Sequence, residues 1–212
     1  FLTKLGIFGK IIKIKQSNSY KIIKRKGLVW NVFISENFFF NMRDIQNFKN
    51  PPLIKTHLVK KAKEWLKKRE INTKVHSLVF VNVRRGDYLY WPSKQSPAVL
   101  SLEWYRNAMK LIKEKVQNPI FILISDDKYY LKDVFNESEN LYISENESDL
   151  DFSIMSLCKH GILSASTFAW CGAYYSNLEK KNETFFIAPK NWTQHRSQNI
   201  TTDDNSNFIT YI

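Results

Sequence analysis

Short apolar segments alternate with segments of helical periodicity between Leu78 and Ala188, and this alternation restricts the fold more than any other feature of the chain. The apolar segments are rich in β-branched and aromatic residues, which is typical of buried strands. They cover residues 78–83, 120–124, 140–144, 161–164 and 184–188. The helical segments between them cover residues 102–116, 128–135, 149–160 and 168–178. Strands that alternate with helices of this length indicate βαβ crossovers, so the sequence predicts an α/β fold with a parallel, Rossmann-type sheet.

Polar residues follow three of the predicted strands at the point where each strand ends. They are Arg84 and Arg85, Asp126 and Asp127, and Ser166 and Thr167. Ligands of open α/β sheets bind outside the carboxyl ends of the strands, so the three pairs are expected to lie around one crevice. Arginines neutralise phosphate oxygens, a carboxylate accepts hydrogen bonds from a base or ribose, and hydroxyls at a helix N-terminus favour anions. The pattern predicts a nucleotide site, although the chain has neither a Gly-x-Gly-x-x-Gly nor a Walker motif.

Each pair also has a purely structural interpretation. In that interpretation the two arginines form a solvated turn, the two aspartates cap the following helix, and Ser166 with Thr167 is a plain N-cap. The interpretation as a site depends on the combination of all three pairs at one edge of the sheet.

Several other residues are assigned structural places. Trp170, Tyr174 and Tyr175 are expected in the core. His160 is expected at the surface, where it would complement the C-terminal end of a helix. Glu103, near the start of a helix, is interpreted as a partner of the helix dipole, with acid/base work as the alternative.

The cysteine content is low. Cys158 and Cys171 form neither a disulfide framework nor a cysteine-rich metal site, so both are expected to be buried free thiols. That pattern fits a reducing compartment. No apolar run approaches the ~20 residues that a membrane span needs.

The net charge of +12 is concentrated at one end of the chain. Residues 1–76 hold 18 basic and 4 acidic side chains, whereas residues 77–212 hold 14 and 16. A basic segment beside a near-neutral domain suits nucleic acid, an anionic membrane surface or an anionic ligand. The alternative is a Lys-rich solvated surface that follows from a compositional bias toward Lys, Asn and Ile.

A change of pattern near residue 77 divides the chain into two predicted parts. Residues 1–50 alternate apolar and basic groups, which fits short strands or irregular structure. An amphipathic helix is expected over residues 53–69, packed on a domain or, alternatively, lying on a membrane surface. We therefore expect a basic remnant of an N-terminal, acceptor-side domain with its linker helix at 1–76, and a Rossmann-like domain at 77–212. The chain begins with Phe1, and we expect that an N-terminal portion is missing.

Three blocks of the sequence resemble one known family. Val83-Arg84-Arg85-Gly86-Asp87-Tyr88 resembles the His-x-Arg-Arg-Gly-Asp-Tyr motif of α-1,2-fucosyltransferases, glycosyltransferase family 11. The strand that ends in Ser125-Asp126-Asp127 resembles the Ser-Asp-Asp strand of that family. The block from Asp151 through Ala173 resembles its Met-Ser-x-Cys-Lys-His and Ser-Thr-Phe-Ser-Trp-Trp-Gly-Ala segments. The likeness covers about residues 78–190, whereas residues 1–77 match only loosely.

The resemblance implies a GT-B-type enzyme with two Rossmann-like domains. Such an enzyme transfers L-fucose from GDP-fucose to the 2-hydroxyl of a galactoside in a glycan, with inversion. The implied partners are GDP-fucose and a galactose-containing acceptor glycan, and no nucleic acid. The resemblance also implies that no metal and no further cofactor is required. The N-terminal portion would supply much of the acceptor site.

Carried over to this chain, the resemblance assigns the donor site to eight residues. They are Asn82, Arg84, Arg85, Asp126, Asp127, Ser166, Thr167 and Phe168. The arginines would hold the diphosphate, an aspartate of the second loop would face the guanine or ribose, and the third loop would line the phosphate cradle. Because fixed arginines stabilise the charge that builds on a leaving diphosphate, Arg85 is also predicted to be catalytic.

The catalytic base is less sharply defined. Asp87 is the first choice to take the proton of the acceptor, and Glu103 is the second. Asn82 stands where the family pattern has His, and Asn does not titrate near neutrality. If that His does acid/base work in the family, activity is weakened here; if it only positions the nucleotide, Asn serves. Cys171 replaces the second Trp of a Trp-Trp pair, which is expected to change packing only.

Three other functions are compatible with parts of the sequence. A transferase of the same fold that uses another nucleotide sugar would share every motif. A nucleic-acid-binding protein would need basic residues interleaved with exposed aromatics, whereas the Lys excess lies outside the motif-bearing region. Arg85-Gly86-Asp87 matches an adhesion tripeptide, but it follows a buried strand. We expect a bacterial cytoplasmic enzyme for a surface glycan, peripheral to the inner membrane through the basic segment, or a Golgi membrane enzyme if the source is animal.

Overall fold

The computed structural model describes residues 8–14, 30–35, 51–180, 183–190 and 208–212. The chain divides into two compact units, Phe1–Lys49 and Asn50–Ile212. In the first unit, β1 (Phe8–Ile14) and β2 (Trp30–Ser35) pair in parallel. These strands agree with the short strands expected there, whereas the basic-apolar run around Ile22 lies outside the described residues.

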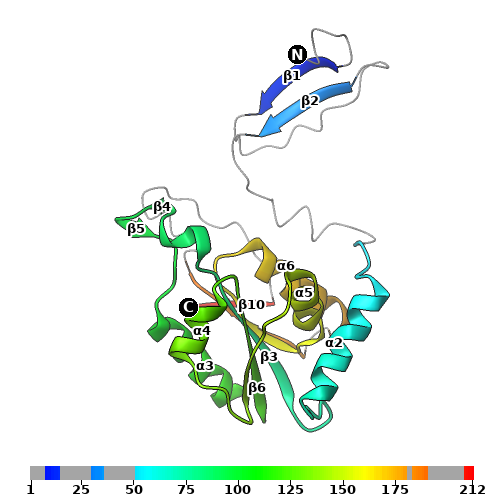
Figure 1. Cartoon of the computed structure of the whole chain (residues 1–212), viewed down its shortest axis with the longest axis vertical. Coiled ribbons are helices and arrows are strands. Elements are labelled where there is room, and N and C mark those ends of the chain that lie inside the picture. Colours follow the sequence, from blue (N-terminus) through cyan, green and yellow to red (C-terminus); the bar gives the residue numbers. More distant parts are fainter. Residues whose placement is uncertain (1–7, 15–29, 36–50, 181–182, 191–207) are drawn as a thin grey trace. The chain divides into compact units, whose positions relative to one another are not determined.

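The second unit is an α/β/α sandwich around a six-stranded sheet in which all neighbouring strands are parallel (Figure 1). The strands are β3 (Ser77–Val83), β6 (Pro119–Ser125), β7 (Leu141–Ile143), β8 (His160–Ile162), β9 (Phe185–Ala188) and β10 (Ile209–Tyr211). The helices are α2 (Thr56–Lys68), α3 (Leu102–Lys115), α4 (Lys128–Val134), α5 (Ser148–Leu157) and α6 (Thr167–Glu179). A 3₁₀ helix, η1 (Gly86–Leu89), and a hairpin of β4 (Pro92–Ser93) and β5 (Ser96–Pro97) lie between β3 and α3.

The strands lie side by side in the order β10-β9-β8-β3-β6-β7. The chain builds β3, β6 and β7 outward in one direction, returns to the other side of β3, and then builds β8, β9 and β10 outward. This is the strand order of the Rossmann fold, and the order reverses between β3 and β8. Ligands of such sheets bind at this switch point, outside the carboxyl ends of the strands.

Helices cover both faces of the sheet (Figure 1). On the face covered by α3 and α4, Val79, Val81, Phe121 and Leu123 join Ile112 of α3 in the main core cluster. Helices α5 and α6 pack together over the other face. Because β3 and β6 are covered on both sides, their sequences are continuous apolar runs rather than alternating ones.

The elements predicted for residues 78–188 are confirmed, with small shifts at their ends. Ser101 caps α3, since its hydroxyl oxygen accepts a hydrogen bond of 3.1 Å from the N–H of Trp104. The structure adds η1, the β4–β5 hairpin and β10, which the periodicity did not indicate. Each of these is too short to show a period of its own.

Helix α2 groups with the second unit. It packs against α5, and its buried residues are Ala62, Trp65 and Leu66. From the sequence we expected this helix in the segment 1–76, whereas the two compact units divide between Lys49 and Asn50. An apolar helical stripe needs a partner, and α5 provides it.

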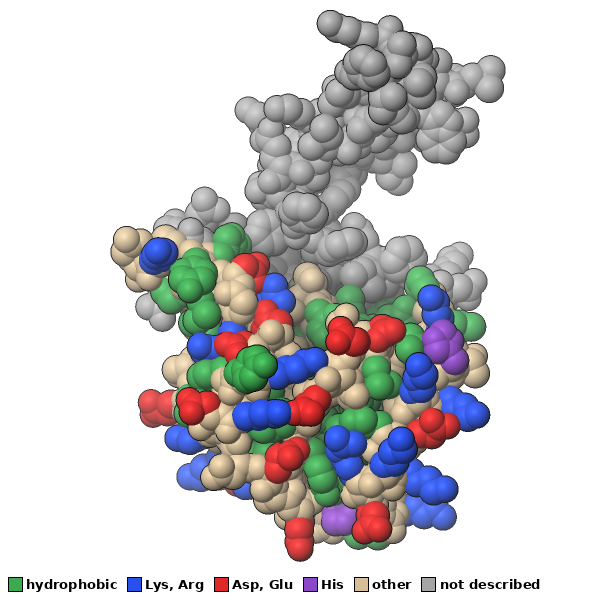
Figure 2. Space-filling view, in the orientation of Figure 1, with side chains coloured by type: hydrophobic (Ala, Val, Ile, Leu, Met, Phe, Trp, Pro, Cys, Tyr) green, Lys and Arg blue, Asp and Glu red, His purple; other side chains and the backbone are tan. Residues whose placement is uncertain are grey.

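Lys and Arg side chains gather on the flank that α2 covers (Figure 2). Of the helices in the described ranges, none is both long and apolar enough to span a bilayer.

The expectation for His160 is wrong. Helix α5 ends at Leu157, and His160 is the first residue of β8, where it is 6% exposed. Its Nδ1 accepts a hydrogen bond of 3.0 Å from the N–H of Phe185. Burial lowers the pKa of His160 to about 4. The sequence predicted a helix up to residue 160 and a strand from residue 161, whereas the helix ends at Leu157 and His160 already belongs to the strand.

The other structural expectations are confirmed in the main. Trp170 and Tyr174 are buried, whereas Tyr175 is half-buried and its hydroxyl donates a hydrogen bond of 2.6 Å to the carbonyl of Pro52. Cys158 is a buried thiol and Cys171 a partly buried one, and neither forms a disulfide. Burial raises the pKa of both thiols.

Candidate functional site

Ion pairs join the loops that follow β3 and β6. The guanidinium of Arg84 lies 2.8 Å from Oδ2 of Asp126 and 2.5 Å from Oδ1 of Asp87. The Nε of Arg85 lies 3.1 Å from Oδ2 of Asp127, and the backbone N–H of Arg85 donates a hydrogen bond of 2.9 Å to Asp126. The structure therefore brings together the two loops that the sequence placed at one edge of the sheet.

Arg85 is also held by an aromatic ring. Its guanidinium carbon lies 3.5 Å from the ring centroid of Tyr130 in α4, within the range of a cation–π contact. The N–H of Tyr130 donates a hydrogen bond of 3.0 Å to Asp127, so the predicted capping role of Asp127 is confirmed. That hydrogen bond, with a smaller contribution from Arg85, lowers the pKa of Asp127 against the opposing effect of burial. Asp127 thus caps a helix and orients an arginine at once.

Ser125, the last residue of β6, connects the two loops through its hydroxyl. The hydroxyl of Ser125 donates a hydrogen bond of 2.6 Å to the carbonyl of Val83, and its oxygen accepts one of 2.9 Å from the N–H of Asp127. Ser125 is buried. The ends of β3 and β6 are therefore fixed relative to each other before any ligand binds.

A side chain at Gly86 would meet the carboxylate of Asp126. A Cβ at this position would lie 2.5 Å from Oδ2 of Asp126, the same oxygen that pairs with Arg84. A side chain at this position would therefore displace the Asp126 carboxylate from its place beside Arg84.

Asn82 lies beneath the switch point. It is 5% exposed in β3, and its side-chain oxygen accepts a hydrogen bond of 2.5 Å from the hydroxyl of Ser164, the second residue after β8. The bond spans the two strands between which the order of the sheet reverses. The structure places Asn82 as a support of the crevice; its role toward the donor stays a prediction.

The third predicted loop leads into α6. Ser166 occupies the N-cap position but makes no capping hydrogen bond with its side chain. Thr167 is exposed, and Phe168 is half-buried with its ring 5.7 Å from that of Phe152. Backbone N–H groups at such an end favour an anion. The loop lies at the same sheet edge as the arginines, because it follows the neighbouring strand of β3.

Tyr88 ties the first loop to the third. Its hydroxyl donates a hydrogen bond of 2.6 Å to the carbonyl of Ala165. Its ring stacks on that of Trp91, with the centroids 5.5 Å apart. Burial raises the pKa of Tyr88. This tyrosine belongs to the Arg-Arg-Gly-Asp-Tyr motif, which is the only signal in the sequence that points to it, and no role was predicted for it.

The site carries two guanidinium groups and three carboxylates in direct contact. Aspartates neutralise both arginines. A diphosphate would compete for the same N–H donors, because its oxygens match the guanidinium fork as well as a carboxylate does. Glu103 is exposed in the first turn of α3, which confirms its interpretation as a partner of the helix dipole.

A cavity lies outside this cluster of charged side chains. A cavity of about 790 Å³ adjoins Ser77 at the amino end of β3 and is lined by several lysines, among them Lys63 and Lys67. Because ligands of such sheets bind at the carboxyl ends, we place the candidate site at the loops instead.

Within the ranges that the structure describes, no group of three or more His, Cys, Asp or Glu is placed to hold a metal ion.

Comparison with known proteins identifies the family. The sequence model of Glycosyl transferase family 11 matches residues 12–209. This chain belongs to glycosyltransferase family 11. The parallel sheet flanked by helices agrees with the GT-B, Rossmann-like fold that the resemblance implied for family 11. No solved structure matches the chain.

Two of three relatives of this family 11 chain are named for the sugar that they transfer, colitose in one and fucose in the other. It is 29% identical over 129 residues to the O-antigen biosynthesis glycosyltransferase WbnK of Escherichia coli, across 58% of this chain and 42% of that protein. It is 31% identical over 127 residues to an alpha-1,2-colitosyltransferase of Escherichia coli, across 57% and 43%. It is 27% identical over 119 residues to the galactoside alpha-(1,2)-fucosyltransferase 1 of Mus musculus, across 53% and 30%. Each match thus covers less than half of the relative.

Proposed function

We propose that this chain is the donor-binding part of an inverting α-1,2-fucosyltransferase, which transfers L-fucose from GDP-fucose to the 2-hydroxyl of a galactoside. The observation that carries the proposal is the cluster of Arg84 and Arg85 with three aspartates at the carboxyl edge of a Rossmann-ordered sheet. Membership of family 11 and the relatives named as fucosyltransferases support it.

The two arginines are prepared differently for the diphosphate. The Arg85 side chain is 19% exposed and is held by Asp127 and the Tyr130 ring, so it is ordered before the donor arrives. The Arg84 side chain is 37% exposed and shares its N–H groups between Asp126 and Asp87. Diphosphate oxygens replace part of these contacts, and the N–H groups at the start of α6 add donors.

The reaction needs one nucleophile, one leaving group and one base. The acceptor hydroxyl oxygen attacks the anomeric carbon of the fucose, from the face opposite the diphosphate, and the bond from that carbon to the diphosphate oxygen breaks. The bonding electron pair leaves with GDP, whose growing charge Arg84 and Arg85 neutralise. The proton of the acceptor hydroxyl passes to the carboxylate of Asp87. The configuration at the anomeric carbon is thereby inverted.

The contact between Arg84 and Asp87 couples the two substrates. The Asp87 side chain is 60% exposed and bonds to Arg84 through Oδ1. When the diphosphate engages Arg84, this bond weakens and the carboxylate becomes available to the acceptor. Donor binding thus precedes activation of the acceptor.

A second candidate for the transferred sugar is colitose. One observation favours it: the relative named as an alpha-1,2-colitosyltransferase is 31% identical to this chain. The diphosphate contacts described above would be the same for either sugar.

The same proposal has consequences for cofactors, for nucleic acid and for location. The site needs no metal or additional cofactor, because the guanidinium groups supply the positive charge, and no nucleic acid takes part. A cytoplasmic location, with peripheral membrane contact through the basic N-terminal segment, stays a prediction.

A transfer assay with lactose as acceptor tests the proposal. GDP-fucose and nucleoside-diphosphate-linked colitose are offered separately to the whole chain, and products are identified by mass spectrometry and NMR. We expect a 2-linked product from one donor, formed about 10- to 100-fold more slowly by Arg85→Ala, because the lost contact involves charged hydrogen bonds. Arg106→Ala, which removes an exposed arginine of α3, is the control. Equal rates for the two variants would contradict the proposal.

A further inference from the structure

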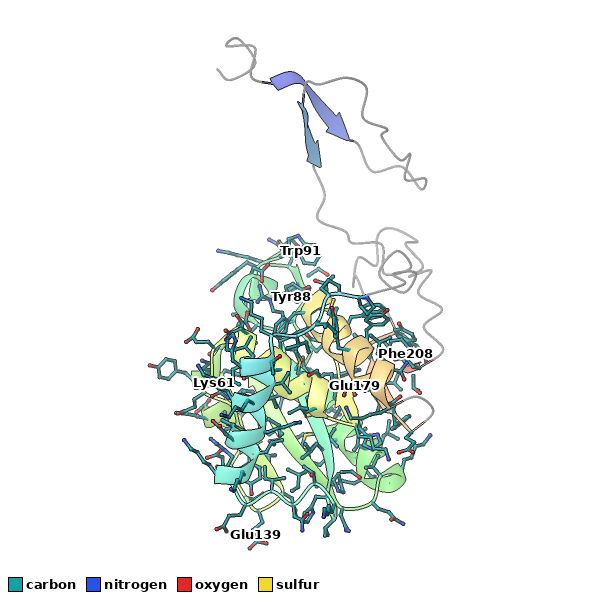
Figure 3. All side chains as sticks on the ribbon, turned by 90° about the vertical axis from the view of Figure 1, so that its right-hand side faces the viewer. Lys61, Tyr88, Trp91, Glu139, Glu179 and Phe208 are labelled. Carbon is teal, nitrogen blue, oxygen red and sulfur yellow. The ribbon has the colours of Figure 1, made fainter. Side chains whose placement is uncertain are left out.

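A pair of exposed aromatic side chains lies beside the site and takes no part in donor binding as proposed above. Tyr90 is 61% exposed and Trp91 is 37% exposed. They belong to a segment, residues 88–97, that contains the β4–β5 hairpin and that we call the aromatic flap. Tyr88 and Trp91 lie at one end of the second unit, opposite Glu139 (Figure 3). Two of the five large apolar side chains that are exposed in the described residues are therefore adjacent here.

The aromatic flap is fixed at its base. The N–H groups of Tyr90 and Trp91 donate hydrogen bonds of 3.0 and 2.9 Å to the carbonyl of Asp87. The N–H of Ala98 lies within hydrogen-bonding distance of two carbonyls, those of Tyr88 and Trp91, at 3.1 and 2.8 Å. The hydroxyl of Tyr88 binds the carbonyl of Ala165. These hydrogen bonds thus hold the backbone that carries the two exposed rings.

The aromatic flap begins at the reacting groups. The Arg84 guanidinium carbon lies 5.6 Å from the ring centroid of Tyr88, which stacks on Trp91. The same guanidinium pairs with the Asp87 carboxylate. A ligand on the exposed rings would therefore lie next to both the diphosphate site and the proposed base.

The chemistry of this surface fits a sugar ring. One face of a galactose ring carries aligned C–H bonds, and its edge carries hydroxyls. An aromatic face buries the first, and nearby polar or charged groups bind the second. The ammonium of Lys94 lies 5.7 Å from the Tyr90 ring centroid, and Asp87 directly precedes the segment in the chain.

We infer that Tyr90 and Trp91 form the platform on which the galactose ring of the acceptor stacks, with its hydroxyl directed at Asp87. This inference rests on the proposed function. An acceptor is favoured over the guanine of the donor because the carboxylate that must meet an acceptor hydroxyl directly precedes the segment in the chain. The nucleotide belongs at the switch point between β3 and β8.

The test measures sugar binding without turnover. Saturation-transfer NMR with lactose, at saturating GDP, is recorded for the whole chain and for Trp91→Ala, Trp91→Phe and Tyr129→Ala. Tyr129 is 89% exposed on α4 and is the matched aromatic control. Calorimetry gives the GDP affinity of each protein, and thermal unfolding checks its fold.

We expect Trp91→Ala to weaken lactose binding about 3- to 10-fold, because one ring stack is lost, with GDP affinity unchanged. Trp91→Phe retains an aromatic face and restores most of the binding, and Tyr129→Ala behaves as the unmodified chain. An unchanged lactose affinity in Trp91→Ala, a loss of GDP affinity instead, or no lactose binding by the unmodified chain would overturn the inference. Failure of the unmodified chain to bind GDP is a separate result, which counts against the proposed function.

Discussion

The hydroxyl of Ser164 donates a hydrogen bond to the side-chain oxygen of Asn82, and this bond joins the ends of the two strands between which the sheet reverses its order. Ser164 and Asn82 are 1% and 5% exposed. The crevice where a nucleotide would bind therefore rests on a buried polar pair.

Removing the donor of that pair should destabilise the fold. Ser164→Ala leaves the oxygen of Asn82 buried without this partner, which costs about 1–3 kcal/mol. Chemical denaturation measures the loss, with Ser138→Ala, at an exposed position, as the control. Equal free energies of unfolding for the two variants would show that the bond has no structural weight.

Two glycines should separate binding from folding. Alanine at Gly86 places a Cβ 2.5 Å from Oδ2 of Asp126 and disturbs the Arg84 pair, so GDP affinity should fall at least about tenfold while stability changes little. Alanine at Gly161 places a Cβ 2.4 Å from the buried ring of Phe80 and should cost about 1–3 kcal/mol of stability instead. Calorimetry and denaturation of both variants check the contrast, and the opposite assignment would refute it.

His160 should make the fold sensitive to acid. Burial lowers its folded pKa to about 4 from a usual value of 6.5, so the unfolded chain binds its proton first as the pH falls. The stability that His160 contributes is complete above pH 6.5 and is lost toward pH 4, by up to about 1.4 kcal/mol per pH unit. His160→Asn keeps an acceptor for the Phe185 N–H but does not titrate, so its stability should not show this loss. Parallel pH profiles for the two proteins would contradict the assignment.

Asp151 should have the opposite effect. Burial raises its pKa from 3.8 to about 6, although Ser144 donates a hydrogen bond to it. A raised folded pKa means that the folded chain holds the proton longer, so stability present below pH 3.8 is lost as the pH rises through 6. Asp151→Asn should therefore gain stability over the unmodified chain in that window, whereas the exposed Asp133→Asn should not. Denaturation at pH 4, 5 and 7 measures the difference, and a constant offset would argue against it.

The sequence predicted the layered architecture because β3 and β6 are long, apolar and rich in β-branched residues. It predicted the strand β8 but not the place of His160, which the sequence assigned to the end of the preceding helix and which is the first residue of β8. Nor did it indicate β10, whose residues Ile209–Tyr211 gain their place from the neighbouring β9.

The sequence likewise predicted one part of the candidate site and missed another. The positions of Arg84 and Arg85 beside Asp126 and Asp127 followed from the rule that parallel strands end at one edge. The pairing within this group did not follow, because it depends on side-chain geometry across loops far apart in the chain. The position of Tyr130 under Arg85 depends on the start of α4, and no pattern in the sequence signals it.

The most direct test of the account is a calorimetric titration of the whole chain with GDP. We expect one site, weakened at least about tenfold by Arg85→Ala and unaffected by Arg106→Ala, because Arg85 is the arginine that Asp127 and Tyr130 hold ready for the diphosphate. The same affinity for UDP would leave the fold assignment unchanged but would point to a different nucleotide-sugar donor. No GDP binding, or equal binding by Arg85→Ala, would contradict the assignment of this cluster as a nucleotide-sugar site.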